Sequence, residues 1–396
     1  MAASPHDLDS ADPLASFRDR FVIDDDLVAY LDGNSLGRLP VATLDRLTTF
    51  VREEWGSRLI RGWSEGWVDL PVTVGDELGR ELLGAADGQT VIADSTSVCI
   101  HKLLHAAASL RADRDEIIID ATNFPTDRYL VEAVAEARGM TVRRLEPDLV
   151  ENVTTEVLAG ALGERTAVVL LSHVDYRSGT LLDLPAITDA VHAAGAVVIW
   201  DLCHSSGVVP IELDAAGVDF AVGCTYKYVN AGPGAPAFAY VAARHLAQAE
   251  QPIPGWWSAA DLFAMSDTYE ASPTIRRMLS GTPPVAAILA VQEGVRLIAE
   301  AGIGPIRDKS VALTTHLIEQ LDAAGLEIVT PRDPHRRGSH VTVRHPRARE
   351  IAAAMLERGV VPDFREPDLI RLGLSPLTTS YAEVAAGVAV LAELAR

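Results

Sequence analysis

Between residues 116 and 241 the chain alternates short runs of aliphatic residues with longer segments of helical periodicity. The apolar runs that predict strands are 116–120, 167–174, 196–202, 219–225 and 237–241. Helical segments separate several of these runs, at 126–139 and 184–195. Such alternation is typical of a mostly parallel sheet whose strands are joined by helical crossovers. We therefore predict an α/β fold.

The chain has 396 residues, which is more than one ordinary core usually holds. Its character changes after about residue 285, where a long amphipathic helix precedes several short strands and helices. We predict a large domain over 41–285 and a smaller C-terminal α+β domain over 286–396. We expect residues 1–40 to form an N-terminal arm that contributes to the small domain.

Polar side chains follow the predicted strands at the points where the strands end. They lie at 122–127, at 173–177, at Asp201 with His204, and at Tyr226 with Lys227. Ligands of open α/β sheets bind at the carboxyl ends of the strands. These segments therefore predict one crevice lined by an acid, histidines, a tyrosine and a lysine.

Lys227 is one of only three lysines among 34 basic residues. A lysine in an apolar setting can lose its proton and form a Schiff base, whereas an arginine stays charged. Asp201 follows the neighbouring predicted strand, and an aspartate there suits the pyridinium nitrogen of a cofactor. A lysine combined with such an acid indicates pyridoxal phosphate.

The other needs of that cofactor are a phosphate site and a stacking surface. The run Ser95, Thr96, Ser97 opens a predicted helix, and the amides of a helix N-terminus bind phosphate. Phe124 offers an aromatic face for the pyridine ring. Each signal alone is weak, since a lysine at a strand end is more often a surface residue. Their joint occurrence in sheet order supports the cofactor prediction.

Several motifs together resemble kynureninase, a family of fold-type-I hydrolases that depend on pyridoxal phosphate. They are YLDGNSLGRLP, EEWGSRLIRGW, NFPTDRYL, SHVDYRSG, VVIWDLCHSSGVVPIEL, FAVGCTYKYVNAGPGAPAF, GTPPV, RGSHV and FREPDLIRLGLSPL, which span nearly the whole chain. The resemblance implies cleavage of the Cβ–Cγ bond of L-kynurenine, or of a ring-substituted kynurenine. The products would be anthranilate, or its analogue, and L-alanine, within tryptophan catabolism and NAD biosynthesis.

The resemblance also assigns roles to individual residues. It implies that Lys227 forms the Schiff base and moves the Cα proton, that Asp201 pairs with the pyridine nitrogen, and that Tyr226 holds the phosphate and donates a proton. The remaining cofactor contacts that it implies are Thr96, Ser97, Phe124, Asp127 and His204, with Trp256 and Thr282 from the partner subunit of a homodimer with shared active sites. Arg371 would hold the substrate carboxylate bidentately, with Ser35 on the substrate side.

Simpler interpretations exist for three of these residues. Arg371 could be a surface arginine, His204 a core histidine, and Ser35 only part of a turn that sets the course of the chain. The chain also departs from the family, with GWWSA at 255–259 in place of the usual GWFGH and PLT at 376–378 in place of PLY. These changes favour a variation in the substrate rather than in the reaction. Thr282 favours the unhydroxylated kynurenine.

Four alternatives remain at this point: a class V aminotransferase, a cysteine desulfurase, an enzyme for another γ-oxo amino acid, and a cofactor-binding protein without turnover. A desulfurase needs a nucleophilic cysteine on a C-terminal loop, but the last cysteine is Cys224. No strand–GxGxxG–helix pattern occurs, which argues against a nicotinamide-dependent dehydrogenase. An aminotransferase would need a keto-acid acceptor.

Composition limits the partners. The net charge of −21 disfavours nucleic acid and anionic membranes as partners, and no long uncharged apolar stretch predicts a membrane span. Three cysteines without metal-ligand spacing predict no metal site and favour a reducing compartment. The polar N-terminus lacks the features of a signal peptide, so we expect a cytoplasmic protein. The partner that we expect is a small-molecule amino-acid substrate.

Overall fold

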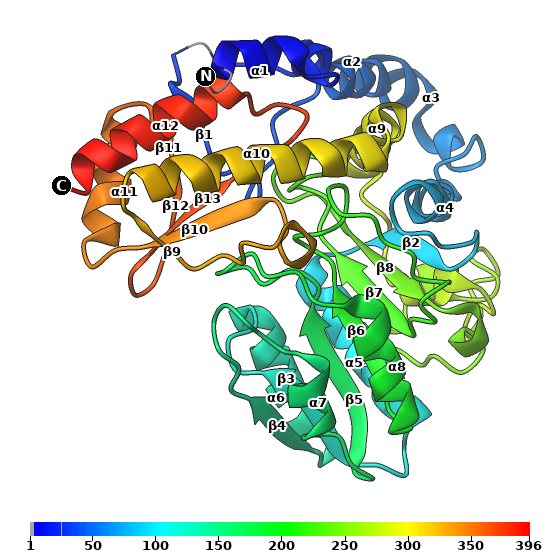
Figure 1. Cartoon of the computed structure of the whole chain (residues 1–396). Helices are drawn as coiled ribbons and strands as arrows, with labels where there is room; N and C mark the ends of the chain where they lie inside the picture. The colour runs from blue at the N-terminus through cyan, green and yellow to red at the C-terminus, as the bar shows by residue number, and fades with distance from the viewer. Residues whose placement is uncertain (1–3, 25) are drawn as a thin grey trace.

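The computed structural model describes residues 4–24 and 26–396 (Figure 1). Its largest element is a seven-stranded sheet in the order β2-β8-β7-β6-β5-β3-β4. The strands are β2 (Thr90–Ala93), β3 (Glu116–Asp120), β4 (Thr141–Leu145), β5 (Thr166–Ser172), β6 (Val197–Asp201), β7 (Phe220–Gly223) and β8 (Ala237–Val241). The strands β3 to β7 pair in parallel, and β8 pairs antiparallel with both of its neighbours, β7 and β2. The predicted mostly parallel α/β sheet is confirmed.

Helices cover both faces of this sheet. They are α4 (Leu70–Leu82), α5 (Thr96–Leu110), α6 (Pro125–Arg138), α7 (Thr155–Ala159), α8 (Leu184–Ala193) and α9 (Val285–Ala301). Successive residues of β6 point to opposite faces: Val198 and Trp200 join the core under α4, α8 and α9, while Val197 and Ile199 join the core under α5 and α6. Both faces are therefore buried, which explains why the parallel strands are uninterrupted apolar runs.

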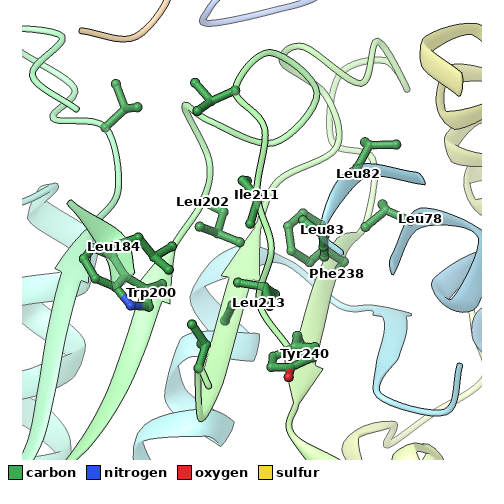
Figure 2. Close-up of a cluster of buried hydrophobic side chains, with 14 of the residues drawn as sticks. Leu78, Leu82, Leu83, Leu184, Trp200, Leu202, Ile211, Leu213, Phe238 and Tyr240 are labelled. Carbon is green, nitrogen blue, oxygen red and sulfur yellow. The ribbon is translucent and has the colours of Figure 1, made fainter. Parts of the chain in front are cut away.

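Trp200 is the largest side chain in the first of these cores. It is fully buried, it lies near Leu184 and Leu202, and its indole N–H donates to Thr188 Oγ1 over 3.1 Å (Figure 2). Aromatic N–H groups usually need such a partner when they are buried. The apolar packing on this face fixes β6, the strand that ends at Asp201.

The remaining strands lie beside the C-terminal helices. An antiparallel sheet has the order β12-β13-β10-β9, and β1 pairs with β11 in parallel. The strands are β1 (Ala29–Tyr30), β9 (Glu327–Ile328), β10 (His340–Arg344), β11 (Val360–Val361), β12 (Asp363–Arg365) and β13 (Leu369–Gly373). The longer helices of the rest of the chain are α1 (Pro5–Ala11), α2 (Val41–Thr49), α10 (Ile303–Ala323), α11 (Ala348–Glu357) and α12 (Tyr381–Leu394).

Short helical turns complete the described chain. They are η1 (Ala15–Arg20), the π-helical η2 (Phe50–Trp55), α3 (Gly56–Arg58), η3 (Leu59–Trp63), η4 (Ala243–His245), η5 (Trp256–Ser258), η6 (Ile275–Met278) and η7 (Pro334–Arg336). Ala29 and Leu31 share one apolar core with residues from the 313–391 part of the chain. The domain boundaries given above stay a prediction, and α9 contributes to the core beside the large sheet. No helix within the described residues combines the length and the apolar character needed to cross a bilayer.

Two strands of the large sheet escaped the sequence analysis. The region before residue 115 looks helical, but β2 crosses it as a four-residue run that pairs only with β8. A strand this short gives no periodicity to detect. The other, β4, lies at the sheet edge and carries two arginines, so it lacks the apolar run of the central strands.

Candidate functional site

One pocket lies where β3, β5, β6 and β7 end at their carboxyl termini. Its lining residues are Thr96, Ser97, Phe124, Thr126, Asp127, Ser172, Tyr176, Asp201, Cys203, His204, Tyr226 and Lys227. In the sheet β3 lies between β4 and β5, so successive strands are added on one side of β3 and then on the other. Ligands of open α/β sheets bind where the strand order reverses in this way. Eight of the residues singled out in the sequence therefore share one pocket.

Lys227 meets a histidine within this pocket. Its Nζ lies 3.0 Å from Nε2 of His204, which is only 5% exposed. Burial, together with the positive charges of Lys227 and Arg371, holds the pKa of His204 well below its usual range. A neutral imidazole can accept a hydrogen bond from the lysine. His204 is thus buried, as a core histidine would be, and also in contact with the lysine.

Two carboxyl groups lie side by side under the pocket. Asp201 ends β6, and its Oδ1 accepts from the backbone N–H of Cys203 over 2.8 Å. Asp127 stands in the first turn of α6 and is 1% exposed, and its Oδ2 has no hydrogen-bond partner. Burial raises the pKa of Asp127 well above its usual range, and the nearby charges of Asp201 and Asp120 raise it further. This favours a protonated Asp127 beside Asp201.

The N-terminus of α5 forms the other end of the pocket. Ser95 is its N-cap, and the Ser95 hydroxyl accepts from the amide of Val98. Thr96 and Ser97, the first two helical residues, line the pocket. The N-terminus of a helix concentrates free amides and partial positive charge, which suits a phosphate group.

The pocket fits pyridoxal phosphate. Asp127 Oδ2 and His204 Nδ1 are buried polar atoms without partners, and buried polar atoms normally have one. Phe124 is 37% exposed and meets Tyr176 edge to face at 5.3 Å. Burial raises the pKa of the Tyr226 phenol, so its hydroxyl stays protonated and can donate to a phosphate. Acid, base, aromatic face and helix N-terminus thus surround one space.

Arg371 lies outside the pocket lining but contacts one of its residues. It is 1% exposed, and it donates to the Tyr176 carbonyl over 2.8 Å and to Ser35 Oγ over 2.6 Å. The same guanidinium forms a 2.6 Å ion pair with Asp363, its cross-strand neighbour on β12. The interpretation of Arg371 as a surface residue is wrong. Ser35 does more than shape a turn, because it contacts this guanidinium.

The turn that carries Ser35 also touches the lysine segment. The amide of Gly37 donates to the Tyr226 carbonyl over 2.8 Å, and a Cβ at Gly37 would lie 2.3 Å from the Lys227 carbonyl oxygen. No side chain fits into that space. The N-terminal arm therefore packs directly on the backbone that carries Lys227.

Trp256 and Thr282 do not reach this pocket. Trp256 is 40% exposed and lines a surface hollow with Met265 and Tyr269. Thr282 is exposed and lines another hollow together with Asp94 and Ser95. Their predicted contact with a partner subunit's cofactor stays a prediction.

Sequence reasoning missed several residues that the fold brings to the site. Ser172 and Cys203 line the pocket, whereas the other two unassigned lining residues, Thr126 and Tyr176, fall within the predicted segments 122–127 and 173–177. Ser172 and Cys203 stand at or just after strand ends, so a wider search of the strand ends would have found them. The ion pair of Arg371 with Asp363 depends on the register of β12 and β13, which no local sequence pattern predicts.

Known proteins similar to the chain fall into two groups. The family model for the "Kynureninase C-terminal domain" matches residues 306–391. A kynureninase of Pseudomonas fluorescens is 42% identical over 98% of this chain and 94% of its own length. A kynureninase of Deinococcus radiodurans is 42% identical over 97% of this chain and 94% of its own.

The second group consists of solved structures. A cysteine desulfurase from Thermococcus onnurineus NA1 has a TM-score of 0.82 at 18% identity, over 100% of this chain and 99% of its own. A C-DES mutant with glycine covalently linked to its PLP cofactor has a TM-score of 0.81 at 20% identity, over 92% and 96%. Likeness at such low identity shows the fold, which is that of fold-type-I enzymes.

Proposed function

The chain belongs to the kynureninase family of pyridoxal-phosphate-dependent hydrolases, and on that premise we propose how its own residues carry out the reaction. The reaction is hydrolytic cleavage of the Cβ–Cγ bond of L-kynurenine, which yields anthranilate and L-alanine. One observation carries the assignment of residues: Lys227 and Asp201 share a pocket with the N-terminus of α5.

The bound cofactor supplies the electron sink that cleavage next to a carbonyl requires. Lys227 holds the cofactor and moves the proton at the substrate Cα. His204 is neutral and lies 3.0 Å from the lysine, so it orients Lys227 without adding a competing charge. Asp201 would pair with the pyridine nitrogen, and the amide of Cys203 already holds one of its carboxylate oxygens. Phe124 packs against the ring.

The phosphate lies at the other end of the pocket in this assignment. Thr96 and Ser97 supply hydroxyls and helix amides, and Tyr226 donates its hydroxyl. Asp127 would lie near the cofactor ring beside Asp201, and burial raises the pKa of its carboxyl well above the usual range. The protonated carboxyl can donate a hydrogen bond where two charged carboxylates would repel each other.

Arg371 binds the substrate carboxylate in this proposal. Its guanidinium is already held by Ser35, the Tyr176 carbonyl and Asp363. A substrate carboxylate would replace Asp363, which can keep its second partner, Arg365, over 2.6 Å. The exchange keeps the buried guanidinium paired at every stage, as a buried charge requires.

We further propose a homodimer in which Trp256 and Thr282 complete the partner's pocket. The support is their exposure in the single chain, which leaves an indole and a hydroxyl facing solvent. All three cysteines are buried and free, which suits the reducing cytoplasm. A role in tryptophan catabolism, leading to NAD biosynthesis, would follow from the substrate.

A ring-substituted kynurenine is the second candidate substrate. The motif GWWSA at 255–259 and Thr378 depart from the family pattern near the expected ring site. A panel of kynurenine, 3-hydroxykynurenine, ring-substituted kynurenines and aliphatic γ-oxo amino acids tests both candidates. We expect L-kynurenine to yield an anthranilate and alanine in equal amounts. Turnover that requires a keto-acid acceptor would show an aminotransferase instead.

A further inference from the structure

The chain contains only three lysines, and each has a close partner. Lys227 meets His204 in the pocket. Lys102 lies 2.6 Å from Asp94 Oδ2, and Lys309 lies 2.6 Å from Asp12 Oδ2. Lys309 joins α10 to the N-terminal arm, far along the chain from the pocket residues. Lys102 differs, because it stands on α5, the helix whose N-terminus forms the phosphate end of the pocket.

Lys102 has two anchors, and both are close. Its side chain is 2% exposed, and its ammonium also donates to the Met278 carbonyl over 2.8 Å. A buried ammonium requires such partners, since burial without them is costly. One of them, Asp94, keeps 31% of its side chain exposed, so water solvates its far side. The ammonium thus connects two segments that are 184 residues apart in sequence, from Asp94 to Met278.

The first anchor sets the entry to α5. Asp94 has a φ of 45°, in the left-handed region that residues other than glycine seldom adopt. Its carbonyl accepts from the amide of Ala237 on β8. Asp94 directly precedes the N-cap Ser95. The ion pair with Lys102 therefore holds the strained residue that aims the α5 amides and Thr96 into the pocket.

The second anchor belongs to the segment that carries Thr282. Met278 ends η6, and Ser280, two residues later, accepts from the amide of Trp257 through its carbonyl over 3.1 Å. A Cβ at Gly255 would lie 2.2 Å from that same carbonyl oxygen, so the 255–257 turn packs tightly on this segment. Trp256 and Thr282 thus move with the Met278 segment.

We propose that Lys102 is a positioning residue that couples cofactor binding in its own subunit to the placement of Trp256 and Thr282 for the partner subunit. The proposal rests on the homodimer and the residue roles of the proposed function. Phosphate bound at α5 fixes Asp94 and Lys102, and Lys102 fixes the Met278 segment. Cofactor binding and dimer formation, if coupled in this way, strengthen each other by the same factor.

The central test compares Lys102→Met with the wild-type chain. We expect the affinity for pyridoxal phosphate, from spectroscopic titration of the cofactor-free enzyme, to fall by about tenfold, within the usual range for coupled sites. Sedimentation with and without cofactor measures the dissociation constant of the dimer. The cofactor should lower that constant for the wild-type chain and leave it unchanged for the variant. Lys102→Arg keeps the charge and should restore part of the coupling.

Lys309→Met is the matched control. It also breaks a buried lysine–aspartate pair, whose two side chains are 6% and 4% exposed. We expect it to lower the resistance to urea while leaving cofactor affinity and the coupling unchanged. Equal losses of cofactor affinity in the two variants would show a general effect of lost stability and would overturn the proposal.

A second variant covers the case in which Lys102→Met does not fold. Asp94→Asn removes the charge of a side chain that is 31% exposed but keeps an oxygen that can accept from the Lys102 ammonium, so the folded state should persist. It should weaken cofactor binding in the same direction by a smaller factor. An unchanged cofactor affinity in Lys102→Met or in Asp94→Asn would overturn the proposal. A cofactor-bound wild-type chain that stays monomeric would overturn it as well. A wild-type chain that binds no pyridoxal phosphate would instead overturn the proposed function itself.

Discussion

Three buried histidines should make the free energy of unfolding depend on pH below neutrality. His173, His204 and His340 are at most 5% exposed. Burial and the charge of Arg307 lower the pKa of His173 to about 3. Burial and the charges of Arg371 and Lys227 hold the pKa of His340 well below its usual range, and the same holds for His204. Each therefore stays neutral in the folded protein and takes up a proton on unfolding.

The magnitude follows from linkage. An unfolded histidine has a pKa of about 6.5, and each extra proton bound on unfolding changes the free energy of unfolding by about 1.4 kcal/mol per pH unit. Because the folded pKa is depressed, the stabilisation is fully present above about pH 6.5 and is lost as pH falls. Integrated from pH 7 to pH 5, each histidine should account for a loss of about 2 kcal/mol.

The perturbation is His340→Gln, which removes one of these protons at a residue that does not itself line the pocket, although its ring lies 5.5 Å from the ring of His204. Neither ring nitrogen of His340 has a hydrogen-bond partner, so glutamine loses none. Urea unfolding at pH 7, 6 and 5, followed by tryptophan fluorescence, gives the free energy of unfolding of the variant and of the wild type. The gap between variant and wild type should shift by about 2 kcal/mol in favour of the variant by pH 5.

The comparison with the variant is needed because other groups act in the opposite sense. Burial raises the pKa of Asp120 and of Asp32 to about 6, so these carboxyls bind protons more readily in the folded state. Their contributions cancel between variant and wild type. A gap that stays constant from pH 7 to pH 5 would refute the reasoning, because His340 would then be as easily protonated folded as unfolded.

Three further substitutions test the packing and the ion pairs. Arg371→Lys cannot keep its contacts with Ser35 and Asp363 together, so KM for kynurenine should rise by about tenfold or more in steady-state assays, and an unchanged KM would contradict the assignment. Gly294→Ala would place a Cβ 1.8 Å from the Val229 carbonyl oxygen, so thermal unfolding should show a loss of about 2 kcal/mol or more. Burial raises the pKa of Asp219, but hydrogen bonds from two histidines and a backbone amide outweigh burial and leave the pKa below its usual value. Asp219→Asn should therefore lower the free energy of unfolding more at pH 7 than at pH 3. Equal losses at the two pH values would show that the charge of Asp219 is not involved.

Local sequence patterns predicted the parts of the site that lie next to strands. Lys227 and Asp201 follow apolar runs that became β7 and β6, and parallel pairing alone brings their ends together. Ser95 was recognisable as a cap because a hydroxyl residue precedes a long helical pattern. Such features depend on neighbours within a few residues, or on the order of strands in one sheet.

Contacts between distant segments could not be predicted in this way. Gly37 lies against the Lys227 carbonyl only because the N-terminal arm folds across the lysine turn. Asp363 meets Arg371 through the register of two short antiparallel strands, and one step of slip would separate them. Burial, with the nearby charge of Asp201, raises the pKa of Asp127, and burial is a property of the packed structure. Packing and register therefore decide how the residues found in the sequence act.

The central claim is that Lys227 holds pyridoxal phosphate in a pocket with Asp201. Reduction of the purified enzyme with borohydride fixes the cofactor to the lysine that carries it, and peptide mapping by mass spectrometry then locates it. The account predicts that the cofactor mass is found on Lys227 and is absent from Lys102 and Lys309, and that Lys227→Ala prevents both labelling and the release of anthranilate. Label on another lysine, or an active Lys227→Ala variant, would contradict it.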